Sequence, residues 1–192
     1  MSVDADARPE ACPPSPSFQQ SLDELVADVE FLVDRTRAVQ DEDLPSYDAV
    51  PRDLIRESVR MNLVAVRDAL LSHRVRLTQR DITNLDNRLL IRGKLGLQIQ
   101  DIVQGSRTSI GVIQKRFVEI ATANGVPLEE ILDATGKLWT LGDAIAVHLA
   151  VSWQHMSLRP PEVVLGWLLR FMRGLLGSSV GGGLLGGWRG WR

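Results

Sequence analysis

The sequence predicts an all-α fold, a bundle of five to six helices, on three observations. Apolar residues recur every three to four positions through most of the chain, which is the period of an amphipathic helix. No stretch combines strict alternation with β-branched residues, as strands do. Two similar phrases, at 96–105 and 125–134, each have the pattern of a glycine turn followed by a helix start. Crossing angles stay open, so an antiparallel bundle and a globin-like stack remain alternatives.

The first predicted helix follows a segment, residues 1–17, whose proline, serine and acidic residues predict disorder. Ser21 and Glu24 have the spacing of a capping box, which places the helix start there. Its apolar period continues to about Val39, and the acidic segment 41–48 ends it.

The next two helices have clear start signals. Pro51 opens the second helix, and Thr78 with Asp81 opens the third, which runs to Gly93 or Gly96. Their predicted buried positions are Leu54, Ile55, Val59, Leu63, Val66, Leu70 and Leu71 in the second and Ile82, Leu85, Leu89 and Leu90 in the third. The second helix points its arginines largely toward solvent.

The last two helices flank the second glycine phrase. The fourth covers roughly Ile99–Ala123, and the fifth runs from Pro127 to about Leu158. Glu129 and Glu130 fall in the first turn of the fifth helix, where negative charge meets the positive end of the helix dipole. Its predicted inward residues are Leu128, Ile131, Leu132, Leu138, Trp139, Leu141, Ile145, Leu149 and Trp153.

The 192 residues are enough for one core, which predicts a single helical domain at 18–158. A linker-type helix at 159–176 and an irregular tail of glycine, tryptophan and arginine at 177–192 follow it. Arg170 and Arg173 interrupt the apolar run of that helix, so no membrane span is expected. The single Cys12 excludes an internal disulfide, and with no N-terminal leader pattern the expected location is cytoplasmic.

The charge distribution argues against nucleic-acid binding. Residues 1–50 carry 12 acidic and 3 basic groups, and farther along the arginines alternate with acids at helical spacing. A protein that binds DNA through its phosphates needs a concentrated positive face instead. Direct DNA binding by this chain is therefore not expected.

No set of acid, base, nucleophile and metal ligands converges in the sequence, so no catalytic residue, metal or cofactor is predicted. His148 and His155 are seven residues apart, and we interpret them as structural rather than as haem or metal ligands. Ser106, Thr108 and Ser109 have no histidine close in sequence, which leaves a nucleophile unsupported.

The run from Tyr47 to Leu158 resembles the N-terminal helical regulatory domain of PucR/CdaR-type bacterial transcription regulators, which is similar to the N-terminal domain of RsbR-type co-antagonists. The matching residues are Tyr47, Pro51, Leu54, Val59 and Asn62, then Arg92, Gly96, Asp101, Ile102 and Arg107, then Ala121, Gly125, Ile131, Leu132, Leu138, Trp139 and Asp143. The resemblance covers about three fifths of the chain. PucR-like regulators continue into a DNA-binding domain, which we expect this chain to lack; its C-terminal tail is interpreted as a truncation or reading-frame product.

The resemblance implies a regulatory, signal-receiving domain that forms a homodimer or meets a partner protein. The alternative is a sensor that holds a small anionic or apolar molecule between the third and fifth predicted helices. An enzyme is not expected. The residues predicted as interface or ligand contacts are Arg92, Asp101, Arg107, Trp139 and Trp153. Arg92 and Arg107 either bind an acidic ligand or, as the preferred interpretation, pair with Asp101 and Glu119.

Overall fold

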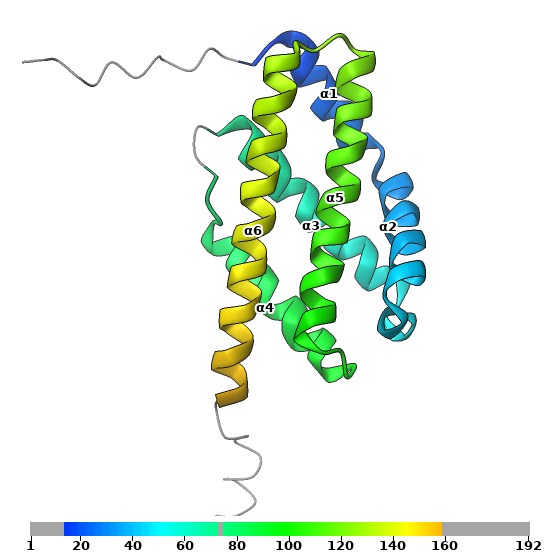
Figure 1. Ribbon diagram of the computed structural model, residues 1–192, viewed down its shortest axis with the longest axis vertical. Helices are drawn as coiled ribbons and strands as arrows, with labels where there is room; N and C mark the ends of the chain where they lie inside the picture. The colour runs from blue at the N-terminus through cyan, green and yellow to red at the C-terminus, as the bar shows by residue number, and fades with distance from the viewer. Residues whose placement is uncertain (1–13, 73–74, 159–192) are drawn as a thin grey trace, which may run out of the picture. The chain divides into compact units, whose positions relative to one another are not determined.

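The computed structural model describes residues 14–72 and 75–158, and within them the all-α prediction is confirmed (Figure 1). The described residues form six α-helices and one 3₁₀ turn, without a strand. The helices are α1 Pro16–Ala27, α2 Val29–Asp43, α3 Arg52–Leu71, α4 Gln79–Lys94, α5 Ile99–Ala123 and α6 Leu128–Leu158, with η1 at Pro45–Ala49. The predictions for 1–13, the linker-type helix and the C-terminal tail lie outside the described residues.

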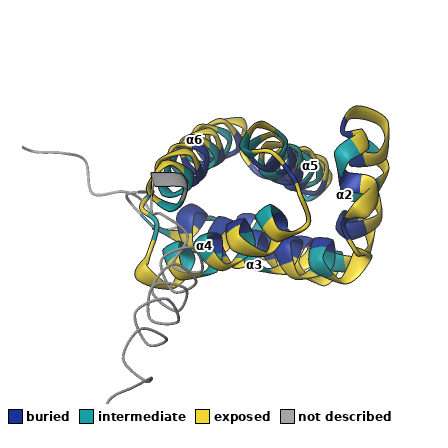
Figure 2. Ribbon diagram, turned by 90° about the horizontal axis from the view of Figure 1, so that it is seen from below, coloured by how far each residue is buried: buried dark blue, intermediate teal, exposed yellow. Residues whose placement is uncertain are grey.

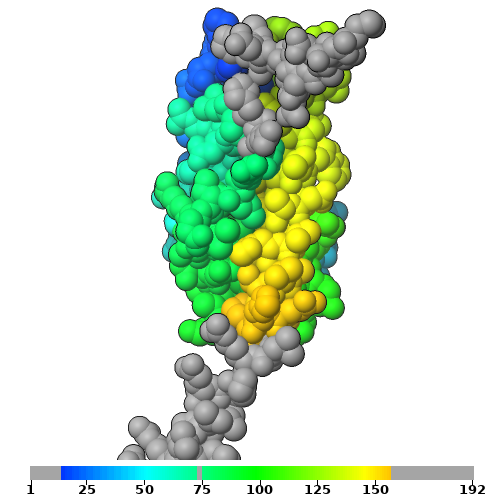
Figure 3. Space-filling view, turned by 90° about the vertical axis from the view of Figure 1, so that its left-hand side faces the viewer, coloured from blue at the N-terminus to red at the C-terminus, as the bar shows by residue number. Residues whose placement is uncertain are grey.

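The helices form two layers, and the compact unit ends at Trp153, within α6. Figure 2 shows α5 beside α6 in one layer, α3 and α4 in the other, and α2 next to α5, with the buried sides turned inward. The α6 helix also lies along α3 and α4 (Figure 3). Lys137 Nζ donates to the carbonyl of Leu70 at 3.5 Å. None of the described helices is both long and apolar enough to cross a bilayer.

Both predicted glycine turns are confirmed. Gly96 has a φ of 87° and Gly125 a φ of 67°, in the left-handed region that glycine adopts without a Cβ penalty. The N–H of Leu97 donates to the carbonyl of Arg92 at 3.2 Å, and that of Val126 to Ala121 at 3.0 Å. Both turns therefore use the six-residue closure of a Schellman motif, and α5 between them has the predicted limits.

The predicted first helix begins earlier than expected and is two helices. Ser15 caps α1 by accepting from the N–H of Phe18 at 3.2 Å, so Pro16 is already helical. Ser21, the predicted cap, is buried inside α1 and donates back to the carbonyl of Ser17. The helix breaks at Asp28, whose carboxylate accepts from Arg116 Nε of α5 at 2.8 Å.

The starts of α3 and α4 agree with the sequence. Thr78 and Asp81 form a reciprocal capping box, in which the Thr78 N–H donates to Asp81 at 2.8 Å. The predicted stripe of α3 is buried at Ile55, Val59, Leu63, Val66 and Leu70. The outermost predicted positions, Leu71 and Leu90, are instead 43% and 48% exposed.

On α6 the central buried residues were predicted correctly, but several residues next to them were predicted as buried and are exposed. Leu138, Leu141, Ile145 and Leu149 are buried as predicted. Trp139, Leu128 and Leu132 were predicted to face inward and are 65%, 68% and 60% exposed. Trp139 follows Leu138 directly, which turns it ~100° around the helix and away from the core. Because α6 is apolar on two sides, periodicity alone did not identify the covered one.

Candidate functional site

The α5 helix has a buried polar cluster on one side and a surface groove on another. The buried polar cluster consists of the buried Thr36, Gln40, Ser58, Asn62, Arg92 and Ser109, together with the half-buried Arg88. Its members come from α2, α3, α4 and α5, so four helices position it. Polar groups in such surroundings are held by mutual hydrogen bonds, because water does not compensate them.

Arg92 lies at the centre of the cluster and is only 7% exposed. Its Nη2 donates to Ser58 Oγ at 2.7 Å, and its guanidinium lies 5.9 Å from the centroid of the Tyr47 ring. The predicted ion pair with Asp101 is wrong. In the described part of the chain, the ion pairs found include none between Arg92 and a carboxylate.

Arg88 continues the network one helical turn before Arg92. Its Nη1 donates to Asn62 Oδ1 at 3.0 Å, and Asn62 Nδ2 donates to Ser109 Oγ at 2.9 Å. Burial, and then the charge of Arg92, lower the pKa of Arg88 to about 10. The guanidinium is therefore still a cation at neutral pH, and like charges of two arginines share the cluster.

Tyr47 closes the cluster from η1 and is 1% exposed, although it lies within the acidic segment 41–48. Its ring occupies the space that a side chain at position 105 would need: a Cβ on Gly105 would lie 2.9 Å from Tyr47 Cε1 and closer still to the phenol end. Gln40 Nε2 donates to the carbonyl of Gly105 at 3.2 Å, which fixes the same turn of α5. Burial raises the pKa of the Tyr47 phenol.

A narrow cavity of about 10 Å³ lies within the buried polar cluster. Three buried polar atoms on its lining residues have no hydrogen-bond partner: Thr36 Oγ1, Gln40 Oε1 and Arg92 Nε. Buried polar atoms are seldom left without a partner, so each of these needs an explanation.

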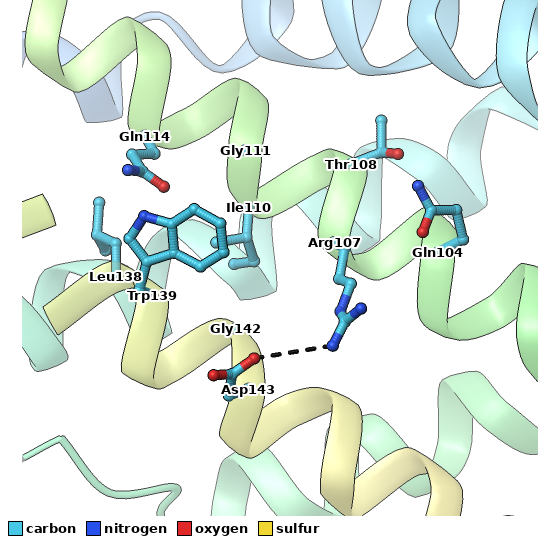
Figure 4. A pocket seen from close by; sticks show the side chains of 10 residues that line it. All are labelled: Gln104, Arg107, Thr108, Ile110, Gly111, Gln114, Leu138, Trp139, Gly142 and Asp143. Atoms are coloured by element: carbon cyan, nitrogen blue, oxygen red, sulfur yellow. Dashed lines mark ion pairs between the residues drawn. The ribbon is translucent and has the colours of Figure 1, made fainter. Parts of the chain in front are cut away.

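The surface groove lies between α5 and α6 and has a volume of about 400 Å³ (Figure 4). Trp139, Leu138 and Ile110 line its apolar end. At the other end, Arg107 Nη2 lies 3.8 Å from Asp143 Oδ1, and both side chains are more than half exposed. The predicted pairing of Arg107 with Asp101 or Glu119 is therefore wrong.

Two glycines line this groove. Gly142 faces Ile110, whose Cγ2 would lie 3.8 Å from a Cβ built on it. Around Gly111 there is no atom within 4 Å of the Cβ position. The space beside Gly111 is therefore open, whereas Gly142 lies in ordinary contact distance of Ile110.

The remaining predicted contacts are divided between these places. Arg107 and Trp139 meet in the groove, whereas Arg92 belongs to the buried polar cluster. Asp101 is half-buried in the first turn of α5, and its charge helps to raise the pKa of Tyr47. Trp153 packs against α4, where its Cζ3 would lie 3.2 Å from a Cβ on Gly93.

His148 makes a structural contact between α6 and α4. Its Nε2 lies 2.8 Å from Asp86 Oδ1 and 3.2 Å from Ser152 Oγ. This contact fits the structural interpretation of that histidine. Residues 14–72 and 75–158 contain no group of three or more His, Cys, Asp or Glu side chains placed to hold a metal ion.

The sequence analysis missed Ser58, Asn62 and Arg88 as members of a site. A signal for all three was present, because they occupy apolar-stripe positions. Ser58 and Asn62 stand among the buried residues of α3, and Arg88 and Arg92 stand beside Leu85 and Leu89 on α4. Polar residues at stripe positions are expected to be buried with partners.

Comparison with models of known protein families gives a match over most of the described helices. Residues 30–159 match the family described as RsbT co-antagonist protein rsbRD N-terminal domain, which is regulatory and non-catalytic. Neither the curated proteins nor the solved structures contain a significant match. The matched region is more than half of the chain and includes α2 to α6, with the buried polar cluster and the groove. The chain therefore belongs to the RsbT co-antagonist protein rsbRD N-terminal domain family.

Proposed function

We propose that this domain receives a signal and transmits it by self-association through α6, as the regulatory part of a PucR-like transcription regulator. Membership of a regulatory, non-catalytic family supports the general role. The resemblance of residues 47–158 to PucR/CdaR-type domains supports the narrower one. The observation that carries the self-association is the outer face of α6.

The outer face of α6 is a ridge of exposed residues that the rest of the described chain leaves uncovered. Its members are Leu128, Leu132, Gly136, Trp139, Asp143, Val147 and Val151. Their spacing of three or four places them along one side of the helix. Trp139 and Val147 are 65% and 64% exposed, in the same range as the two leucines. Exposed apolar residues aligned in this way, here interrupted by Gly136 and the charged Asp143, are typical of a surface that contacts another protein.

The helix glycines support a close approach by another chain. Neither Gly111 nor Gly136 has an atom within 4 Å of its Cβ position. A glycine inside a helix costs about 0.5–1 kcal/mol relative to alanine, and no contact inside this chain explains that cost here. A second helix lying against α5 and α6 would use the space that these residues leave open.

A second copy of this chain is the occupant that we propose. In a two-fold dimer the same patch serves both subunits, so the patch has to be complementary to itself. Here the exposed Trp139 stands beside the groove of about 400 Å³, and opposite charges, Arg107 and Asp143, stand at the other end. Trp139 of each subunit would enter the groove of its partner.

Direct DNA binding is not part of the proposal. Several arginines of the described residues are occupied by carboxylates, which cancels their charge toward a phosphate backbone. The pairs are Arg37 with Asp41, Arg52 with Asp34, Arg56 with Glu30 and Arg116 with Asp28.

The test is size-exclusion chromatography with light scattering on the full chain over a range of concentrations. We expect a dimer for the native chain and an at least tenfold higher dissociation constant for Trp139→Ser, because a buried tryptophan at an interface is commonly a hot spot. The matched control is Leu90→Ser on α4, which changes a 48% exposed apolar residue away from the ridge. A native chain that stays monomeric at all concentrations contradicts the proposal.

A second candidate function, a small-ligand sensor, is supported by the unpaired atoms of the buried polar cluster. That cluster lies among α2, α3, α4 and α5, rather than between the third and fifth predicted helices, which are α4 and α6. The guanidinium groups of the cluster and its cavity of about 10 Å³ restrict such a ligand to a small anion.

A further inference from the structure

The buried polar cluster contains two guanidinium groups and no carboxylate. Arg88 and Arg92 donate to the neutral side chains of Asn62 and Ser58. Among the described residues, the ion pairs include none for either arginine. Removing a charge from water is costly unless an opposite charge accompanies it, so buried cations are normally paired. Arg88 is half-buried and the carboxylates of Asp81 and Glu57 act on its charge, so the one buried charge without an opposite charge is that of Arg92.

Unused hydrogen-bond donors accompany this unpaired charge. Arg92 Nε–H is buried and has no partner, and the Thr36 hydroxyl is in the same condition. Both residues line the cavity. Gln40 Oε1 is also unpaired, but it is an acceptor and adds nothing to the binding of an anion.

The size of the cavity limits what can enter. About 10 Å³ is the space that one water molecule needs for its centre. A monatomic anion such as chloride is somewhat larger than water and is the only class of anion close to this size, whereas phosphate or a metabolite carboxylate would have to displace the helices. The cation–π contact between Arg92 and Tyr47 offers part of the compensation that a counter-ion gives, but Arg88 has no such contact among the described residues.

We propose that the buried polar cluster is an anion site that holds one compact monovalent anion, of the size of chloride, between Arg88 and Arg92. The ion supplies the missing negative charge and accepts from Arg92 Nε–H and the Thr36 hydroxyl. Because the cluster joins α2, α3, α4 and α5, the bound ion stabilises the contacts between both helix layers. This site is independent of the self-association proposed above.

The test is thermal unfolding of the full chain in sodium chloride against sodium gluconate at equal ionic strength. A ligand that binds only the folded state raises the Tm, here by about 3–5 °C for each tenfold increase of chloride above its Kd. Line broadening in ³⁵Cl NMR measures binding directly. Equal Tm values in the two salts, without broadening, overturn the site and leave a water molecule in the cavity.

Two variants test the location. Arg92→Met removes the central guanidinium and should abolish both the chloride dependence and the broadening. Thr36→Val keeps the shape of the side chain, removes the unpaired hydroxyl, and should reduce the chloride dependence at least twofold without lowering the Tm in gluconate. It replaces Arg92→Met if that variant does not fold. Arg80→Met, at an exposed position of the same helix, is the control and should behave as the native chain.

Two further outcomes contradict the proposal. A chloride effect that persists in both cluster variants places the ion elsewhere. A larger stabilisation by phosphate than by chloride, lost in the cluster variants, contradicts the size argument. Repeating the titration with Trp139→Ser separates this site from self-association, because the chloride dependence should survive in a monomer.

Discussion

Two glycines of α5, six positions apart, have opposite surroundings. At Gly105 the Tyr47 ring fills the space of the missing side chain, and a Cβ would lie 2.9 Å from Cε1. At Gly111 the corresponding space is empty to 4 Å. The first glycine is explained by packing inside the chain and the second is not. One side of α5 is therefore complete in the monomer, and the other is open to a partner.

The arginines on the two sides differ in the same way. Arg92 is 7% exposed and donates to neutral groups, whereas Arg107 is 56% exposed on its side chain and has a carboxylate 3.8 Å away. The arginine with the carboxylate is the one whose charge matters less, because water screens it. How far each arginine is buried, rather than whether it has a carboxylate partner, decides how much its charge affects the free energy of unfolding.

The largest effect is expected for Gly105→Ala. The added Cβ meets the ring of a fully buried tyrosine, so the free energy of unfolding should fall by about 3 kcal/mol. Denaturant unfolding measures it. A loss below 1 kcal/mol would mean that η1 shifts to make room for the added Cβ, and that Gly105 is not more tightly packed than Gly111.

Asn62→Ala should cost about 2 kcal/mol, because Ser109 loses its partner and Arg88 keeps only the Ser58 carbonyl, at 3.4 Å. The same unfolding experiment applies. Asn84→Ala, at a half-buried position on α4, is the control for removing an amide and should change stability much less. Equal losses in the two variants would mean that the hydrogen bonds of the buried polar cluster contribute no more to stability than a half-buried amide on α4.

Gly111→Ala should have the opposite sign to Gly105→Ala and raise the free energy of unfolding by about 0.5–1 kcal/mol at concentrations where the chain is monomeric. Gly111→Leu should instead weaken self-association, since its side chain enters the groove. The two readouts are denaturant unfolding and light scattering. A dimer unaffected by leucine would place the interface away from α5.

The smallest effect is expected for Arg107→Gln. The ion pair with Asp143 is long and exposed, so the free energy of unfolding should change by less than about 0.5 kcal/mol. Arg92→Gln is the matched variant at the buried arginine and should lower the free energy of unfolding more. A larger loss from Arg107→Gln than from Arg92→Gln would show that burial does not decide how much these charges contribute.

Local signals predicted most of the fold. The glycine turns at 96 and 125 and the capping box at Thr78 depend on residues within one turn of each other, and the structure confirms them. At the break, Asp28 accepts from Arg116, which lies 88 positions away in sequence, whereas local periodicity predicted a continuous helix. Contacts over such distances are set by packing, which one sequence does not encode in its spacing.

The site was less predictable for the same reason. Arg92 and Trp139 were predicted as contacts. The sequence predicted a carboxylate partner for Arg92, which instead donates to Ser58, and it predicted that Trp139 faces the core, whereas Trp139 is 65% exposed. Tyr47 and Gly105 are 58 positions apart, and only the folded chain brings the ring to the glycine. The polar residues on the apolar stripes of α3 and α4 were the indication of a buried network that the sequence contained.

The α1 helix lies before residue 30, where the family match begins, yet it completes the core. Phe18 packs edge-on against Phe117 with ring centroids 5.4 Å apart, and Leu22 and Leu25 are 1% exposed. Ser15 donates to Glu130, which ties this helix to the start of α6. A shortened protein that starts at residue 30 would expose Phe117 and the apolar surface under Leu22 and Leu25, so it should be less stable and more prone to aggregation than the full chain.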